Sequence, residues 1–108
     1  MSQSFHNKIL CVNLTDRTIR VDEPGAVHFR KYLGGWNIIA DILLREVPKG
    51  ADPLGPENKL IFAPGPLSGS SVPCASRMAV TAKSPLTGAV GMALSGGHFP
   101  VEMKFAGY

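Results

Sequence analysis

The sequence predicts an α+β fold with a mostly antiparallel sheet, an N-terminal hairpin, one interrupted helix and a short C-terminal helix. Short apolar stretches with a period of two lie in both halves of the 108-residue chain, and one helical stripe lies between them. Strands and helices do not alternate as βαβ units would. The 12 glycines and 9 prolines indicate that much of the chain is turn. A chain this short forms one domain, residues 1–108, with a single modest core.

The opening segment is expected to form a β-hairpin over residues 9–21. Leu10 and Val12 alternate with less apolar neighbours, and Ile19 and Val21 resume the same period of two after a polar turn. Alternation of this kind is typical of strands that have one apolar face.

The next segment, residues 26–47, has a helical pattern that two glycines interrupt. Its apolar residues recur at intervals of three or four, and they are Phe29, Leu33, Trp36, Ile39, Leu43 and Val47. We interpret Trp36 as core on this spacing; the alternative is that the neighbouring glycines let a cofactor approach it. A glycine inside a helix costs about 1 kcal/mol relative to alanine. Gly34 and Gly35 therefore indicate either a break between two helices or a close approach of another backbone.

The second half of the chain is expected to hold three strands and a helix, over residues 60–63, 77–82, 89–94 and 98–106. The strand at 77–82 alternates so that Arg77 shares a face with the small residues Ala79 and Thr81. An arginine on such an uncrowded face could reach a phosphate or a ring heteroatom with its planar fork of donors. The alternative is an edge-strand arginine that only meets water.

Three glycine-rich turns punctuate this half, namely Gly65–Gly69, Ser84–Gly88 and Ser95–Gly97. Glycine removes side chains where an anionic ligand would approach the backbone. The last turn leads into the 98–106 helix, so Leu94, Ser95 and Gly96 form a candidate anion nest with the free N–H groups of the helix start. The alternative is an ordinary turn. For Ser84–Gly88 a plain turn with proline second is the simpler interpretation.

Charge and cysteine usage exclude several function classes. Lysine and arginine number 11 against 8 acidic residues, a net charge of +3 without a basic cluster, so we expect no nucleic-acid partner. No apolar run is long enough for a membrane span, and the polar start does not resemble a signal peptide, so we expect no membrane partner and a cytoplasmic location. The two cysteines, Cys11 and Cys74, lack metal-site spacing. We interpret Cys74 as a small buried residue.

The order of these motifs resembles one known family. The chain contains GPLSG, a Pro-x-x-x-Arg stretch ending at Arg77, KSPLTG, MALSGG and KFAGY, and the openings ILCVNLTDRTIRV and PLGPENKLIFAPGPL agree as well. This order is similar to the N-terminal domain of the aldehyde ferredoxin oxidoreductases, tungsten enzymes that carry two pterins. The resemblance runs over nearly the whole chain. It is far more specific than a single short glycine motif.

The resemblance implies a cofactor and the residues that hold it. In the family the arginine of this stretch contacts the tungstopterin, and Arg77 aligns with it. The residue at the position of Leu94 is usually asparagine, whose backbone carbonyl helps to hold magnesium between the pterin phosphates. Leu94 retains that carbonyl but not the amide. Ser95 and Gly96 complete the expected cofactor-binding set, tungsten and molybdenum being indistinguishable to these residues, and we expect no catalytic residue in the chain.

The resemblance also implies a longer parent protein. The family's iron–sulfur cluster ligands, proton-handling residues and second pterin-binding stretch lie beyond the residues matched here, so we expect the chain to be the N-terminal part of a longer tungstopterin-binding domain. Such an enzyme oxidises aldehydes to carboxylic acids and passes electrons through the cluster to ferredoxin, and a homo-oligomer is compatible with it. The alternative is a free-standing, non-catalytic module that binds a pterin or phosphate, or an assembly subunit.

Overall fold

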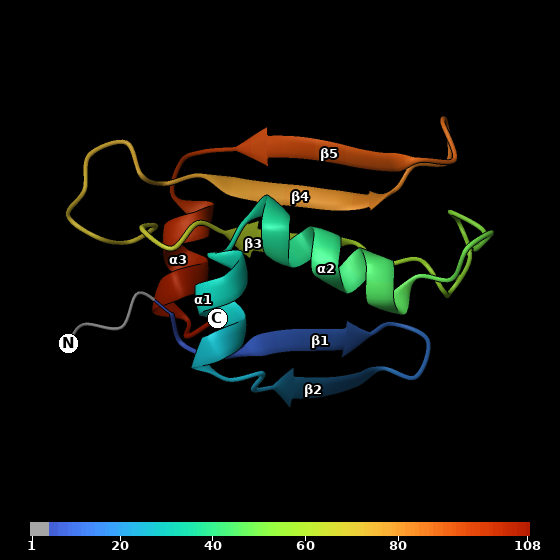
Figure 1. Ribbon diagram of the computed structural model, residues 1–108, viewed down its shortest axis with the longest axis horizontal. Helices are drawn as coiled ribbons and strands as arrows, with labels where there is room; N and C mark the ends of the chain where they lie inside the picture. The colour runs from blue at the N-terminus through green and yellow to red at the C-terminus, as the bar shows by residue number, and fades with distance from the viewer. Residues whose placement is uncertain (1–4) are drawn as a thin grey trace.

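The computed structural model describes residues 5–108 and contains two antiparallel sheets and three helices. The elements follow one another along the chain as β1 (Ile9–Asn13), β2 (Thr18–Asp22), α1 (Ala26–Tyr32), α2 (Trp36–Glu46), β3 (Ile61–Pro64), β4 (Met78–Lys83), β5 (Val90–Ser95) and α3 (Phe99–Phe105). The α+β fold with an antiparallel sheet is confirmed. Figure 1 shows the hairpin of β1 and β2 along one side of the molecule and the sheet of β3, β4 and β5 along the opposite side, with the helices between and beside them.

The predicted hairpin is confirmed within one residue. Strands β1 and β2 pair in antiparallel register, so that Leu10 lies opposite Val21 and Val12 opposite Ile19. The side-chain oxygen of Asn13 accepts the N–H groups of Thr15 at 2.9 Å and of the following residue at 3.2 Å, which fixes the turn.

Both interpretations of the glycine pair are confirmed. Helix α1 ends before Leu33, which is left-handed at φ +61°, and α2 begins after Gly35. At the break the chain runs against the end of β3. The Gly35 N–H donates to the carbonyl of Pro64 at 3.2 Å, and a Cβ on Gly34 would lie 3.1 Å from the same oxygen. Gly34 also has a φ of +112°, a conformation that L side chains rarely adopt.

The three later strands form one sheet in the order β3-β4-β5, each displaced by one residue from its expected bounds. Helix α2 covers one face of β3 and β4, where Ile39 and Leu43 pack on Ala63 and Ala79. The small residue Ala79 of β4 thus leaves room for the side chains of α2 that pack on it. The expectation of an uncrowded face beside Arg77 is wrong for this reason.

Two further expectations about position need correction. Trp36 is 41% exposed although its spacing places it on the same helical face as Leu43, because it is the first residue of α2, beside the glycine break. The helix expected over 98–106 is α3, which spans Phe99–Phe105 and packs beside β3, where the ring of Phe99 meets the edge of Phe62.

Candidate functional site

The Gly65–Gly69 turn, the start of β4 and the Ser95–Gly97 turn meet at one end of the three-stranded sheet. The backbone of Arg77 joins the first two. Gly65 N–H donates to the Arg77 carbonyl at 3.0 Å, which extends the β3–β4 pairing by one step. The buried hydroxyl of Ser68 lies 3.2 Å from the carbonyl oxygens of both Ala75 and Arg77 and shares its hydrogen between them. The Gly65–Gly69 turn is thus fixed to the residue that precedes β4.

The side chain of Arg77 lies against the Ser95–Gly97 turn. Strand β4 begins at Met78, so Arg77 stands just outside it and is exposed. A Cβ built on Gly96 would lie 3.9 Å from both Cδ and Nε of Arg77 and 3.4 Å from the Ser76 carbonyl oxygen. Within residues 5–108 no ion pair or side-chain hydrogen bond engages the Arg77 guanidinium. The guanidinium is therefore available to an anion at the Gly96 turn.

The pairing of β4 with β5 determines where the backbone of Leu94 points. Ser84 N–H donates to the Ala89 carbonyl at 2.7 Å, so that pair is hydrogen-bonded, and such pairs alternate with non-hydrogen-bonded ones along an antiparallel ladder. The alternation makes Ala79 and Leu94 a non-hydrogen-bonded pair. Because β5 is an edge strand, the Leu94 N–H and C=O point away from β4 and towards the free edge.

Ser95 and Gly96, the other members of the candidate set, come directly after Leu94 in the chain. Ser95 pairs with Met78 as the last residue of β5, and its hydroxyl donates to the Gly96 carbonyl at 3.3 Å. Gly96 is exposed and begins the turn towards α3. Arg77, Leu94, Ser95 and Gly96 therefore lie together, on two neighbouring strand ends.

The start of α3 contributes less to this site than its sequence suggested. The helix has only 7 residues, and Pro100 in its first turn has no N–H to donate. His98 caps the helix without a side-chain hydrogen bond and is exposed. The donors next to Arg77 therefore belong to the strand end and the turn more than to a helix dipole.

The Ser84–Gly88 turn lies at the opposite end of the sheet, where it joins β4 to β5. Gly88 N–H donates to the Ser84 carbonyl at 2.8 Å, and the Ser84 hydroxyl accepts the Thr87 N–H at 3.4 Å. Its interpretation as an ordinary turn is confirmed, and it takes no part in the site around Arg77.

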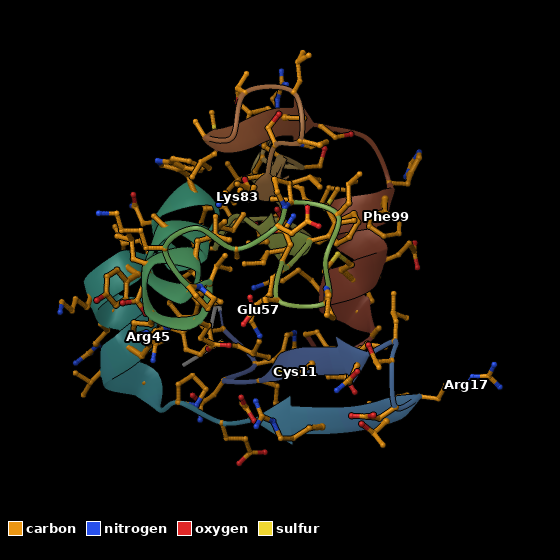
Figure 2. All side chains as sticks on the ribbon, turned by 90° about the vertical axis from the view of Figure 1, so that its right-hand side faces the viewer. Cys11, Arg17, Arg45, Glu57, Lys83 and Phe99 are labelled. Carbon is orange, nitrogen blue, oxygen red and sulfur yellow. The ribbon has the colours of Figure 1, made fainter. Side chains whose placement is uncertain are left out.

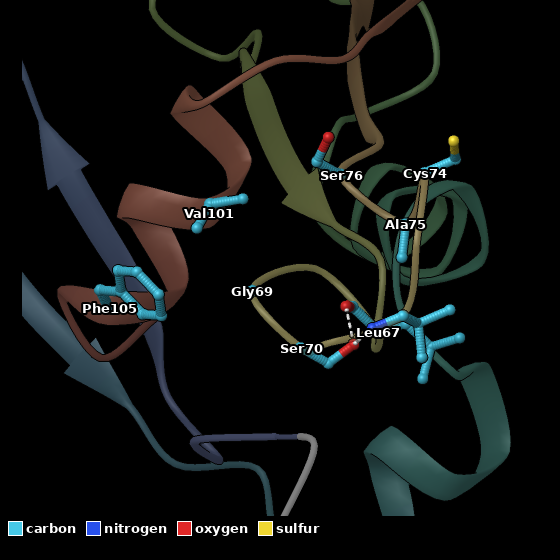
Figure 3. Close-up of a pocket in the computed structure, with 9 residues that line it drawn as sticks. Leu67, Gly69, Ser70, Cys74, Ala75, Ser76, Val101 and Phe105 are labelled. Carbon is cyan, nitrogen blue, oxygen red and sulfur yellow. Dashed lines mark hydrogen bonds between the residues drawn. The ribbon is translucent and has the colours of Figure 1, made fainter.

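A pocket of about 250 Å³ opens beside the site, between α3 and the 67–76 loop. Figure 3 shows Val101 and Phe105 of α3 on one side of it, and Gly69, Ser70 and Ser76 from the loop on the other. Arg77 is absent from its lining, so this pocket is separate from the guanidinium. The lining includes Cys74, which is exposed and left-handed at φ +60°, so its interpretation as a buried residue is wrong.

The side chains of the described region do not supply a metal site of their own. Among residues 5–108, histidine, cysteine and carboxylate side chains do not gather in threes around a point that could hold a metal ion. In the same region none of the helices is both long and apolar enough to cross a membrane.

Lys104 of α3 is buried with its ammonium 5.7 Å from the centre of the Phe5 ring, and burial lowers the pKa of this lysine.

Ser68 is the structural residue that sequence reasoning missed. It belongs to the Gly65–Gly69 motif, but a serine in a turn is usually interpreted as a local cap. Nothing in the spacing between residues 68 and 77 indicates that its hydroxyl reaches the backbone next to Arg77. The signal was the motif itself, because Ser68 is the one polar side chain in a turn otherwise made of glycine, proline and leucine.

Comparison with known proteins decides the family. Residues 9–108 match the family described as the N-terminal domain of aldehyde ferredoxin oxidoreductase. The chain belongs to this family. It is 49% identical to the tungsten-containing aldehyde ferredoxin oxidoreductase of Pyrococcus abyssi over 96% of its own length, and 48% identical to that of Thermococcus kodakarensis over 94%.

A solved structure gives the same result for the fold. The structure titled active site complex BamBC of benzoyl coenzyme A reductase in complex with 1,5-dienoyl-CoA superposes with a TM-score of 0.94, at 35% identity and over 100% of the chain. The chain spans 17% of the length of the two curated relatives and 16% of that solved chain. The family expected from the motifs is confirmed, and this aldehyde ferredoxin oxidoreductase domain corresponds to a small part of much longer proteins.

Proposed function

We propose that this domain holds one side of a pterin cofactor that carries tungsten or molybdenum, within an enzyme of the aldehyde ferredoxin oxidoreductase type. The observation that supports this most is the position of the Arg77 side chain, which lies beside Gly96 without a protein partner among residues 5–108. The named relatives are tungsten-containing enzymes, and the chain matches them across the segments that form this site.

The donor set fits such a cofactor. A guanidinium binds phosphate through two parallel hydrogen bonds, and the missing side chain at Gly96 leaves the backbone open beside Arg77. Magnesium prefers oxygen ligands, and the Leu94 carbonyl at the free edge of β5 is one. We therefore assign phosphate binding to Arg77 and the Gly96 backbone, and a magnesium ligand to the Leu94 carbonyl. Ser95 would hold this strand end in place through its pairing with Met78.

The chain's own residues position the cofactor and do not react. When bound, the metal–pterin group accepts the two electrons released as an aldehyde and water become a carboxylate and protons. Arg77 balances phosphate charge, and the hydrogen bond of Ser68 to the Arg77 carbonyl keeps the arginine's backbone in place. The iron–sulfur cluster, the route to ferredoxin and the residues that choose the substrate belong to the remainder of the longer enzyme.

The proposed setting is the cytoplasm. Cys11 and Cys74 are both free thiols in the structure, which a reducing compartment favours. The proposed partners are the remainder of the parent enzyme and ferredoxin, together with a second copy if the parent is a homo-oligomer.

Arg77 variants test the proposal in the longer protein. Arg77→Ala removes a charge-assisted contact worth roughly 1.5 to 3 kcal/mol, so we expect a lower metal-to-protein ratio by elemental mass spectrometry. Arg77→Lys keeps the charge without the fork and should recover only part of the metal. Arg30→Ala, at an exposed arginine on α1, is the control and should leave the ratio unchanged. Equal metal content in all variants would refute the role of Arg77.

A further inference from the structure

The hairpin of β1 and β2 carries its apolar side chains on one face. Leu10 and Val12 on β1 lie directly opposite Val21 and Ile19 on β2. Because residues opposite each other in a ladder share a face, these four form one continuous aliphatic surface, which we call the outer face. All four are exposed, Ile19 to 70%.

The other face of the hairpin, which is largely polar, is turned towards the rest of the molecule. Ile9 packs against the cluster of Phe29, Ile38 and Ile42, so the face it shares with Cys11 points inward. Arg20 lies opposite Cys11 and forms an ion pair with Asp22 at 2.8 Å. The pKa of Arg20 is raised mainly by Cys11 and Asp22, and to a smaller extent by the charge of Glu46, the last residue of α2. Figure 2 shows the hairpin below the helices, with Cys11 on β1.

This orientation reverses the usual one. An antiparallel ribbon with one side on its own domain normally turns apolar residues inward and polar residues to water. A two-stranded hairpin gains little stability by itself, so a solvated aliphatic face is a net cost. Contiguous apolar surface of this kind marks an interaction site.

We propose that the outer face docks on an uncharged apolar surface of the polypeptide that the longer relatives possess beyond the region matched by this chain. The curated relatives provide that length, since the chain spans 17% of each. The inference rests on the proposed function only in placing this domain within a longer polypeptide. It assigns the hairpin a structural role separate from the proposed cofactor site, because β1 and β2 lie on the opposite side of the molecule from β4 and β5 (Figure 1).

The small size of the outer face favours a covalently attached partner over a second copy. A stable interface between separate proteins uses roughly 20 to 30 residues on each side, and four aliphatic side chains cannot supply that. A surface on the same polypeptide acts at an effective concentration of about millimolar or more. A contact of this size is therefore sufficient within one chain.

Thiol labelling of the longer polypeptide tests the docking. In a background of Cys11→Ser and Cys74→Ser, single variants Ile19→Cys and Leu86→Cys would be treated with a water-soluble maleimide, any native thiols elsewhere being subtracted with the unsubstituted background. Leu86, at the tip of the β4–β5 turn, is 92% exposed and serves as the control. We expect Ile19→Cys to react at least tenfold more slowly than Leu86→Cys, and both to react alike in denaturant. Val12→Cys repeats the test if Ile19→Cys does not fold.

Two results would overturn the docking. One is labelling of Ile19→Cys and Val12→Cys at the rate of Leu86→Cys. The other is protection that disappears when sedimentation shows dissociation to monomers, which would assign the face to a second copy. Metal content measured on the same preparations reports the proposed function separately: metal-loaded protein with an exposed hairpin refutes the docking alone, and a protected hairpin without metal refutes the cofactor role alone.

Discussion

The hydroxyl of Ser68 shows how a single residue supports the site without touching a ligand. It is buried and bridges the carbonyl oxygens of Ala75 and Arg77, and both of these oxygens also accept a backbone N–H. Loss of the hydroxyl therefore removes one shared hydrogen bond without leaving an unpaired carbonyl.

We expect Ser68→Ala to lower the free energy of unfolding by about 0.5 to 1.5 kcal/mol, the net worth of a typical hydrogen bond. Urea denaturation of the purified chain measures it. Ser70→Ala is the matched control, because the Ser70 hydroxyl makes a comparable bond to Leu67 but is exposed to water. A loss for Ser68→Ala no larger than that for Ser70→Ala would show that the bridge contributes nothing.

At the scale of elements, the break between α1 and α2 positions the end of β3. The glycine pair allows the backbone to run against Pro64 and Pro66, and Gly65, which lies between them, is bound to the Arg77 carbonyl. The helix break and the sheet end that carries the proposed cofactor site are thus joined through a few backbone contacts.

Gly34→Ala is expected to destabilise the domain by more than about 1 kcal/mol, since its positive φ already disfavours alanine and the new Cβ would meet the Pro64 oxygen at 3.1 Å. Thermal unfolding compares it with Gly88→Ala, which has a positive φ of +69° but no neighbour within 4 Å. The difference between the two isolates the steric contact, and equal losses would mean that the close approach tolerates a side chain.

At the scale of the whole molecule, the domain carries the proposed cofactor face without the ligands of a redox cluster. With two cysteines in the sequence and no group of three candidate ligands among residues 5–108, it cannot bind an iron–sulfur cluster of the usual four-thiolate kind.

The isolated chain is therefore expected to show no aldehyde oxidation. An anoxic assay with short aldehydes and a viologen dye measures this, and the longer protein serves as the positive control. Turnover that co-purifies with the isolated chain would place the chemistry in this domain and contradict the proposed division of roles.

The sequence by itself determined the elements and the family. Period-two alternation located the hairpin and β4 within one residue, because alternate residues of a strand face opposite sides whatever lies beyond them. The glycine pair predicted the helix break, since glycine's cost within a helix is local. The ordered motifs predicted the family that the comparison confirmed.

Only the tertiary structure decided which residues meet and which faces are covered. That α2 lies over Ala79, that Trp36 and Cys74 are exposed, and that the Ser84–Gly88 turn is remote from Arg77 all depend on how distant segments pack. The reversed hairpin makes the same point, because its pattern predicts one apolar face but not the direction of that face. Periodicity records the geometry of one element, whereas burial depends on which other element occupies the space beside it.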